Sequence, residues 1–322
     1  MPASAESAFQ SRAHLAAIGS YVPDGIVTNS DLEKMVDTDH EWIVRRTGIE
    51  QRRRAAADQT TSDLAIAAVR DLLSRFPAVD AARIDGIIVA TTSPDMAFPS
   101  VASKVQHAIG AHRCFAVDLS AACAGFVTAL QMANGMILSG AYRSVLVIGA
   151  ETLTKITDYS DRSTCILFGD GAGAALVEAR DPGAMLAANA VTDGSGGMQV
   201  YCLPNGSIVQ NGREVYKWAL STVPDGVRAL VGQAGLALEA LDWFVPHSAN
   251  LRMIEAICER LGLPSDKALQ SVVKYGNTSA ATIPLALDAA YKEGRLRPEQ
   301  LVALYGFGSG LTQSGLLLRW TI

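Results

Sequence analysis

Three residues of this chain carry side chains suited to nucleophilic catalysis, namely Cys123, His247 and Asn277. Cys123 follows a short apolar run at 115–119 and stands immediately before a long helical pattern. A cysteine reacts as its thiolate, and the unpaired N–H groups at a helix N-terminus favour that anion. Cys123 is therefore a candidate nucleophile, and a buried structural cysteine is the alternative.

A Cys, His and Asn set supports two kinds of chemistry. In a papain-like hydrolase the histidine activates the thiol and the asparagine orients the histidine. In a condensing enzyme both residues donate hydrogen bonds to a thioester carbonyl, which stabilises the enolate formed when a malonyl group loses CO2. The residues around Cys123 lack the Cys-Gly-Ser-Cys-Trp type of sequence typical of the hydrolases. Each residue also has a structural explanation, since a lone histidine is often a core residue and Asn277 stands at a natural helix N-cap.

The order of predicted elements occurs twice along the chain. Strands are expected at 86–92, 115–119 and 144–150, and again at 242–246 and 301–306, with helices between them. The spacing agrees, because 31 positions separate Thr92 from Cys123 and 30 separate His247 from Asn277. This pattern predicts an α/β protein of two similar halves, 1–180 and 181–322. Cys123 and Asn277 would then begin equivalent helices that face one pocket at the carboxyl ends of strands.

Composition excludes several classes of function. The chain has 322 residues, 49% of them hydrophobic and 18% charged, and a net charge of −5, which gives no general attraction for nucleic acid or an anionic membrane. A local cluster of arginines could still bind a polyanion: Arg45, Arg46, Arg52, Arg53 and Arg54. The five cysteines are scattered without a Cys-x-x-Cys pair, so no disulfide framework or metal site is expected. No signal peptide or membrane span is visible, which predicts a cytoplasmic protein.

Two glycine-rich stretches need separate interpretation. Phe168–Ala174 is followed by a short strand rather than a helix, which argues against a dinucleotide-binding loop. Gly306–Gly310 follows a buried strand and lacks the Lys-Ser/Thr of a phosphate loop. Its glycines permit close backbone approach, which suits N–H donors that face an oxyanion.

Five motifs together resemble one family over nearly the whole chain from about Ala13. They are Glu41–Ile49, Ala121–Phe126, His247–Arg252, Tyr275–Thr278 and Phe307–Gly310. The chain is similar to the β-ketoacyl-acyl-carrier-protein synthase III family of the thiolase superfamily. The resemblance implies a five-layered αβαβα fold with two pseudo-repeated halves, and a homodimer.

The resemblance also implies a role for each candidate residue. Cys123 would accept the acyl group of an acyl-CoA, and His247 and Asn277 would promote decarboxylation of the malonyl thioester on an acyl carrier protein. The backbone N–H groups of Cys123 and Ser309 would form the oxyanion hole. The other implied contacts are Trp42, Arg46, Arg162 and Asn250 for CoA, Lys217 and Arg252 for the carrier protein, and Phe307 and Gln210 for the acyl pocket. No tightly bound cofactor or metal is implied, because the coenzyme A thioester is itself the substrate.

The chain departs from the family pattern at four places, and the least of them is Ser248, which replaces the glutamine of the usual His-Gln-Ala-Asn. Ser309 replaces a glycine of Phe-Gly-Gly-Gly, Gln210 stands where an apolar pocket residue is frequent, and Gln313-Ser314 stands where a bulky residue and Gly or Ala are common. These changes bear on the acyl substrate. The alternatives are a related acyltransferase of specialised, polyketide-type metabolism with another acceptor, a Cys-His-Asn hydrolase, or a non-catalytic acyl-CoA-binding protein.

Overall fold

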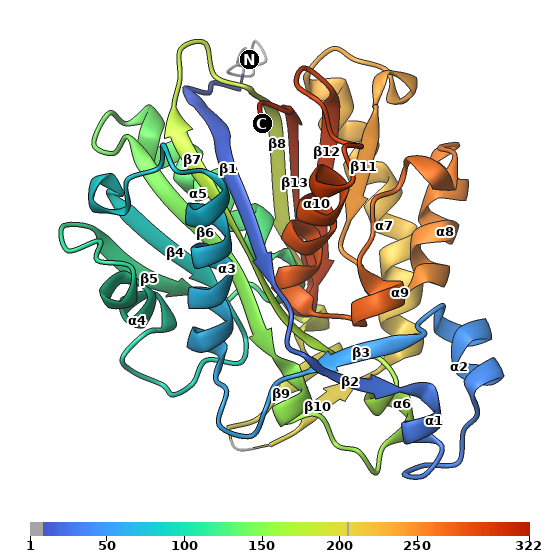
Figure 1. The fold of residues 1–322 in the computed structure, drawn as a ribbon. Coiled ribbons are helices and arrows are strands. Elements are labelled where there is room, and N and C mark those ends of the chain that lie inside the picture. Colours follow the sequence, from blue (N-terminus) through green and yellow to red (C-terminus); the bar gives the residue numbers. More distant parts are fainter. Residues whose placement is uncertain (1–8, 205) are drawn as a thin grey trace.

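Two β-sheets organise the chain in the computed structural model, which describes residues 9–204 and 206–322 (Figure 1). The first sheet has the strand order β1-β7-β6-β4-β5, with β1 Ala13–Tyr21, β4 Gly86–Ala90, β5 Phe115–Leu119, β6 Ser144–Thr152 and β7 Asp170–Ala179. The second has the order β11-β12-β13-β8, with β8 Met185–Thr192, β11 Trp243–Pro246, β12 Leu301–Gly308 and β13 Thr312–Arg319. Two smaller pairs stand apart, β2 Gly25–Thr28 with β3 Gln51–Arg54, and β9 Val200–Cys202 with β10 Ile208–Gln210.

Helices form three layers around these sheets (Figure 1). The outer face of the first sheet packs on α3 Thr61–Arg75 and α4 Val101–Ala108, and that of the second on α7 Gly212–Gln233 and α8 Leu251–Leu261. Between the sheets lie α5 Gly125–Leu138 and α10 Thr282–Lys292, whose apolar side chains reach both sheets. Such a helix is buried because it is apolar around most of its circumference. The result is the five-layered αβαβα arrangement of the thiolase fold.

The remaining helices are short. They are α1 Asn29–Leu32, α2 His40–Thr47, α6 Arg162–Cys165 and α9 Val272–Tyr275. Among the described residues, no helix combines the length and apolar character that a membrane span requires.

Several elements differ from the sequence-based prediction. The 22-residue helix α7 was not predicted, and it contains Pro224, a residue that opposes helix interiors. Its apolar side chains are buried against the second sheet, and this packing outweighs the local propensity. Strands β8 and β13 were also missed, and most of the glycine-rich stretch at 168–174 forms part of buried strand β7.

Each half of the chain has a short turn before its central helix, Ala122–Ala124 in the first half and Ser279–Ala281 in the second. The residues of these two turns correspond to each other differently from the sequence-based prediction. Ala122 and Ser279 have left-handed backbones, with φ of 44° and 46°, and each begins a short 3-10 turn that leads into a central helix. Such a φ is uncommon for residues other than glycine. This alignment makes Ala280 the counterpart of Cys123. Asn277 lies three residues earlier, so the expected equivalence of Cys123 and Asn277 is wrong.

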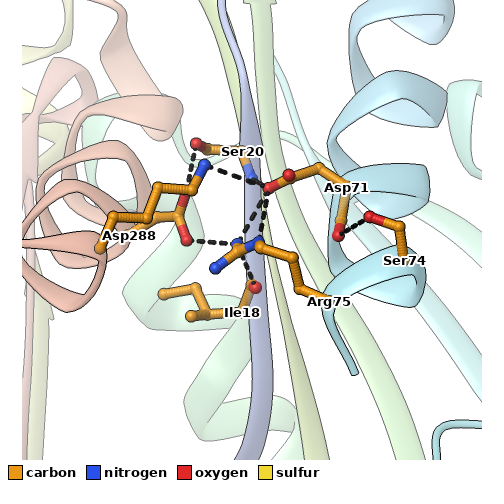
Figure 2. Close-up of polar contacts among 7 residues, drawn as sticks. Ile18, Ser20, Asp71, Ser74, Arg75 and Asp288 are labelled. Carbon is orange, nitrogen blue, oxygen red and sulfur yellow. Dashed lines mark hydrogen bonds and ion pairs between the residues drawn. The ribbon is translucent and has the colours of Figure 1, made fainter. Parts of the chain in front are cut away.

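A buried ionic network joins α10 to α3 and β1 (Figure 2). Asp288 of α10 is fully buried and accepts hydrogen bonds from the Ser20 hydroxyl and from Arg75, whose Nη2 lies 2.5 Å away. Arg75 also donates to Asp71 at 2.9 Å, and Lys292 lies 2.8 Å from Asp288. Because α10 continues directly from the turn at Ser279, this network fixes the helix that supports that turn.

The network yields a prediction for stability. Asp288→Asn leaves Arg75 and Lys292 without their buried carboxylate, and both cations keep part of their hydration because they are 24% and 44% exposed. We therefore expect the free energy of unfolding to fall by about 1–3 kcal/mol, as measured by urea denaturation. Lys34→Ala, which removes an exposed ion pair with Asp31, is the matched control and should change little. Equal unfolding curves for the two variants would contradict the role given to the network.

Candidate active site

Cys123 lies on the short turn between β5 and α5, at the edge of a cavity. The turn packs against β12, where a Cβ atom on Gly308 would stand 3.0 Å from the Cys123 sulfur, so only glycine fits there without displacement. The cavity has a volume of about 280 Å³, and we call it the acyl cavity. Residues from seven segments line it: Thr92, Ser120–Cys123, Leu153, Ile156, Phe168, Val200–Cys202, Ile208, Ser279, Ser309, Gly310 and Thr312.

Asn277 is held by its backbone and by its own side chain. Its N–H donates to the Leu167 carbonyl at 2.8 Å, and its carbonyl accepts from the Gly169 N–H at 3.0 Å. The side-chain oxygen accepts from the Ser279 N–H at 2.8 Å. The Nδ2 group is thereby oriented and left to donate to a ligand.

His247 follows β11 and is almost completely buried. Its N–H donates to the Tyr305 carbonyl at 2.8 Å, and the Phe307 ring packs edge-on against the imidazole with a centroid distance of 5.4 Å. Burial lowers the pKa of His247 to about 3, so the imidazole is neutral at physiological pH. A neutral imidazole has one N–H donor and one acceptor nitrogen.

Thr282 determines which of these nitrogens can face a ligand. Its hydroxyl lies 2.9 Å from His247 Nδ1 and 2.9 Å from the Ser279 carbonyl, and it has a single proton to donate. When this proton is donated to the Ser279 carbonyl, the Thr282 oxygen accepts from Nδ1–H and Nε2 is the acceptor nitrogen. When Thr282 donates to Nδ1 instead, the imidazole proton lies on Nε2 and can be offered to a substrate oxygen, as the proposed reaction requires. One turn, Asn277–Thr282, thus contacts all three candidate residues through Asn277 itself, Ser279 and Thr282.

The Cys123 thiol has a higher pKa than the sequence led us to expect for a cysteine placed just before a helix. Burial raises its pKa to about 12, the nearby Glu151 raises it too, and a hydrogen bond from the Ser279 side chain lowers it. The residue is partly exposed to the acyl cavity, but protein atoms enclose the sulfur. The expectation of a thiolate favoured by the helix N-terminus is therefore wrong for the unliganded protein. α5 begins only at Gly125.

Glu151 was not identified from the sequence. It is the next-to-last residue of β6, is fully buried and accepts hydrogen bonds from Ser93 Oγ at 2.5 Å and from the Thr92 N–H at 3.0 Å. Burial raises its pKa although these hydrogen bonds lower it. A carboxylate at the end of the buried run Ser144–Thr152 is the signal that could have revealed it. Ser279 and Thr282 carried no such signal.

A second cavity, of about 860 Å³, lies beside α2, α7 and α8, and we call it the arginine-lined cavity. It brings together most of the residues predicted to bind CoA or the carrier protein: Trp42, Arg46, Asn250, Lys217 and Arg252. Arg45 and Arg213 also line it. Leu167 lines this cavity and Phe168 lines the acyl cavity, so adjacent residues of one segment border both.

Several of these side chains already have protein partners. The Arg162 guanidinium lies over the Trp42 ring at 4.9 Å, so the two side chains stack directly on each other, and a planar ring could enter between them only if they moved apart. Asn250 caps α8 through a 2.8 Å hydrogen bond from the Met253 N–H. Arg252 pairs with Glu255 at 2.8 Å, and Lys217 pairs with Glu214 at 2.8 Å.

The arginine cluster does not form one site. Of its five members, Arg45 and Arg46 line the arginine-lined cavity. Arg52 is buried and donates to the Ile166 carbonyl, and burial lowers its pKa to about 10. Arg52 is therefore a structural residue.

The residues expected in the acyl pocket lie elsewhere. Gln210 lines the arginine-lined cavity, and Phe307 packs on His247 without lining the acyl cavity. Gln313 accepts a 3.0 Å hydrogen bond from the Tyr305 hydroxyl, and Ser314 accepts one of 3.0 Å from Gln131. Gln313 thus has a partner on β12 and Ser314 has one on α5, and only Ser309 of the departures borders the acyl cavity.

The fold and the site define a thiolase-fold enzyme with a cysteine, a histidine and an asparagine around one turn. Family descriptions of 3-oxoacyl-[acyl-carrier-protein] synthase III match residues 117–194, and those of its C-terminal part match residues 231–320. The chain is 53% identical to a β-ketoacyl-[acyl-carrier-protein] synthase III of Halalkalibacterium halodurans, covering 97% of this chain and 98% of the relative. It is 52% identical to one of Bacillus subtilis, with 96% and 99% covered.

Solved structures agree with these relatives. The enzyme of Thermus thermophilus superposes with a TM-score of 0.91 at 44% identity, covering 95% of this chain and 99% of that one. The enzyme of Aquifex aeolicus gives 0.93 at 41% identity, with 96% and 100% covered. The chain therefore belongs to the β-ketoacyl-acyl-carrier-protein synthase III family.

The raised pKa of Cys123 predicts how its reactivity depends on pH. With a pKa of about 12, the thiolate fraction rises about tenfold for each unit between pH 6.5 and 9. We expect the rate of iodoacetamide alkylation at Cys123, followed by peptide mass spectrometry, to rise throughout this range. A plateau below pH 8 would show instead that the thiolate is stabilised in the free protein.

Proposed function

We propose that this protein catalyses a decarboxylative Claisen condensation that begins fatty acid synthesis. An acyl-CoA acylates Cys123, and malonyl-acyl-carrier protein then yields 3-oxoacyl-acyl-carrier protein and CO2. The observation that carries the proposal is the meeting of Cys123, His247 and Asn277 around the Asn277–Thr282 turn, in a chain 53% identical to a synthase III.

In the first step the Cys123 sulfur attacks the thioester carbon of acyl-CoA. The new S–C bond replaces the C–S bond of CoA, and the thiol proton leaves with the CoA thiolate. The N–H groups of Cys123 and Ser309 are proposed to stabilise the oxyanion. Ser279 is suited to stabilise the Cys123 thiolate by its side-chain hydrogen bond.

In the second step the malonyl carboxylate departs as CO2, and its bonding electrons form an enolate. His247 Nε2 and Asn277 Nδ2 are proposed to donate hydrogen bonds to the enolate oxygen. The enolate carbon attacks the acyl carbon, and the Cys123 sulfur leaves as a thiolate, which takes a proton from water. A His247 pKa of about 3 keeps the imidazole neutral, so it acts here as a hydrogen-bond donor and not as a cation.

The arginine-lined cavity is proposed to bind CoA. Adenine would lie between Trp42 and Arg162, with Arg46 at the phosphates and the Asn250 amide at the pantetheine arm. The arm would pass the Leu167–Phe168 segment to reach Cys123. Lys217 and Arg252 are proposed to receive the acidic carrier protein. The scheme requires no tightly bound cofactor.

Primary fatty acid synthesis is favoured over specialised metabolism. The relatives at 53% and 52% identity are named synthase III, whereas a priming β-ketosynthase of the R1128 polyketide pathway is 34% identical with a TM-score of 0.92. The thiolase fold leaves no basis for a papain-like hydrolase. A cytoplasmic location is part of the proposal, supported by five cysteines that are all free.

A homodimer is also proposed. β5 is the edge strand of the first sheet, and Val117 in its middle is 43% exposed. Phe98 and Met96, on the loop between β4 and α4, are 85% and 45% exposed. An open strand edge beside exposed apolar side chains is suited to pairing with a second copy.

The two half-reactions can be separated by mutation. Wild type incubated with a panel of acyl-CoAs should gain an acyl group by intact-mass measurement, and Cys123→Ser should not. His247→Ala and Asn277→Ala should each reduce CO2 release from malonyl-acyl-carrier protein at least about 100-fold, because each removes an oxyanion donor. Acylation of Cys123 should persist in both.

Two outcomes would contradict this assignment. If no thioester acylates wild type, the condensing reaction is wrong. If His247→Ala and Asn277→Ala decarboxylate at the wild-type rate, the roles given to them are wrong. Lys217→Glu tests carrier docking: it should slow condensation with malonyl-acyl-carrier protein more than it slows Cys123 acylation by acyl-CoA, which reports any effect on CoA binding in the same cavity.

Val117→Lys tests the proposed dimer. A lysine at each copy of the paired edge would place like charges opposite each other, so we expect the mass from light scattering to fall from two chains to one. Met132→Lys, at another exposed apolar side chain, is the control. A monomeric wild type would refute the dimer.

A further inference from the structure

The β9–β10 hairpin is a wall shared by both cavities. Val200, Tyr201, Cys202 and Ile208 line the acyl cavity, and Gln210 lines the arginine-lined cavity. The two strands pair only with each other and join neither large sheet. A two-stranded hairpin is marginally stable by itself, so the position of this wall depends on what holds it.

Ser309 provides a hydrogen bond that holds the hairpin. Its hydroxyl donates to the Val200 carbonyl at 2.6 Å. Within 9–204 and 206–322, the other hydrogen bonds of the hairpin are internal to residues 199–211. The apolar anchors are Ile208, which packs with Leu153 and Phe168, and Val200, which packs against the same cluster. The Ser309 hydroxyl thus supplies the directional link between the hairpin and the rest of the fold.

Ser309 belongs to the same turn that approaches the cysteine. The preceding residue, Gly308, lies against the Cys123 sulfur, and Ser309 itself borders the acyl cavity. On the other side of the turn, Leu311 and Asp193 exchange backbone hydrogen bonds of 2.9 Å each. The turn is therefore fixed at three points, and one of them is the hairpin.

We infer that Ser309 is a positioning residue that fixes the β9–β10 hairpin over the acyl cavity and thereby selects short acyl chains. The inference rests on the proposed function, because it concerns which acyl-CoA acylates Cys123. Held in place, the wall limits the cavity to about 280 Å³, slightly below the roughly 300–1,000 Å³ of typical small-molecule pockets. A longer chain would need the hairpin to move outward, and the hydrogen bond opposes that movement.

The test compares Ser309→Ala and Ser309→Gly with Ser309→Thr, which keeps a hydroxyl. Rates of Cys123 acylation by acetyl-, butyryl-, hexanoyl- and octanoyl-CoA are measured by intact mass. We expect the ratio of the acylation rate with octanoyl-CoA to that with acetyl-CoA to rise about fivefold in the Ala and Gly variants, because each loses one net hydrogen bond. The ratio should stay near the wild-type value in the Thr variant. Ser221→Ala, which removes a hydroxyl that donates to the Trp218 carbonyl on α7, is the matched control.

Hydrogen exchange supplies a readout independent of chemistry. Backbone amides at 200–203 should exchange faster in Ser309→Ala and Ser309→Gly, while those of α7 stay unchanged. If wild type is acylated but the variants keep its chain-length profile or its exchange rates, the inference is wrong. A uniform loss across all chain lengths would also overturn it, because it would indicate only a damaged oxyanion hole. If wild type is acylated by no CoA thioester, the proposed function fails instead.

Discussion

The left-handed backbone of Ser279 is the constraint on which the site depends. It turns the chain sharply enough for Asn277, Ser279 and Thr282 to contact different partners within six residues. Asn277 is oriented by the Ser279 N–H, the Ser279 side chain reaches Cys123, and Thr282 reaches His247. The central helix α10 and its buried Asp288 hold this turn from behind, so a strained conformation is stabilised by packing farther along the chain.

Electrostatics inside this site favour uncharged groups. Burial raises the pKa of Cys123 and of Glu151 and lowers that of His247, so all three are drawn toward their neutral forms. The site therefore offers hydrogen-bond donors in a low-dielectric environment and acquires charge only when substrate brings or generates it. Such an arrangement suits a reaction whose intermediates are an oxyanion and an enolate.

The sequence predicted the parts of the protein whose signals are local. Cys123, His247 and Asn277 stand in short motifs, and strand β5 was predicted with its observed ends. Helix α7 was missed because its stability comes from burial against a sheet formed by distant residues. The sequence could not predict the two cavities, the placement of Gln210 or the partners of Thr282. Each depends on contacts between segments far apart in the chain.

In the second half of the chain Ala280 occupies the position that corresponds to Cys123, and this bears on how many acyl groups one chain can carry. The two turns share their left-handed first residue and lead into the two central helices, yet they differ in surroundings. Cys123 opens onto the acyl cavity, whereas Ala280 is 1% exposed and its carbonyl lies where a side chain on Gly149 would stand. Of these two equivalent positions only Cys123 has a nucleophile, so the proposed reaction would load one equivalent of acyl group on each chain.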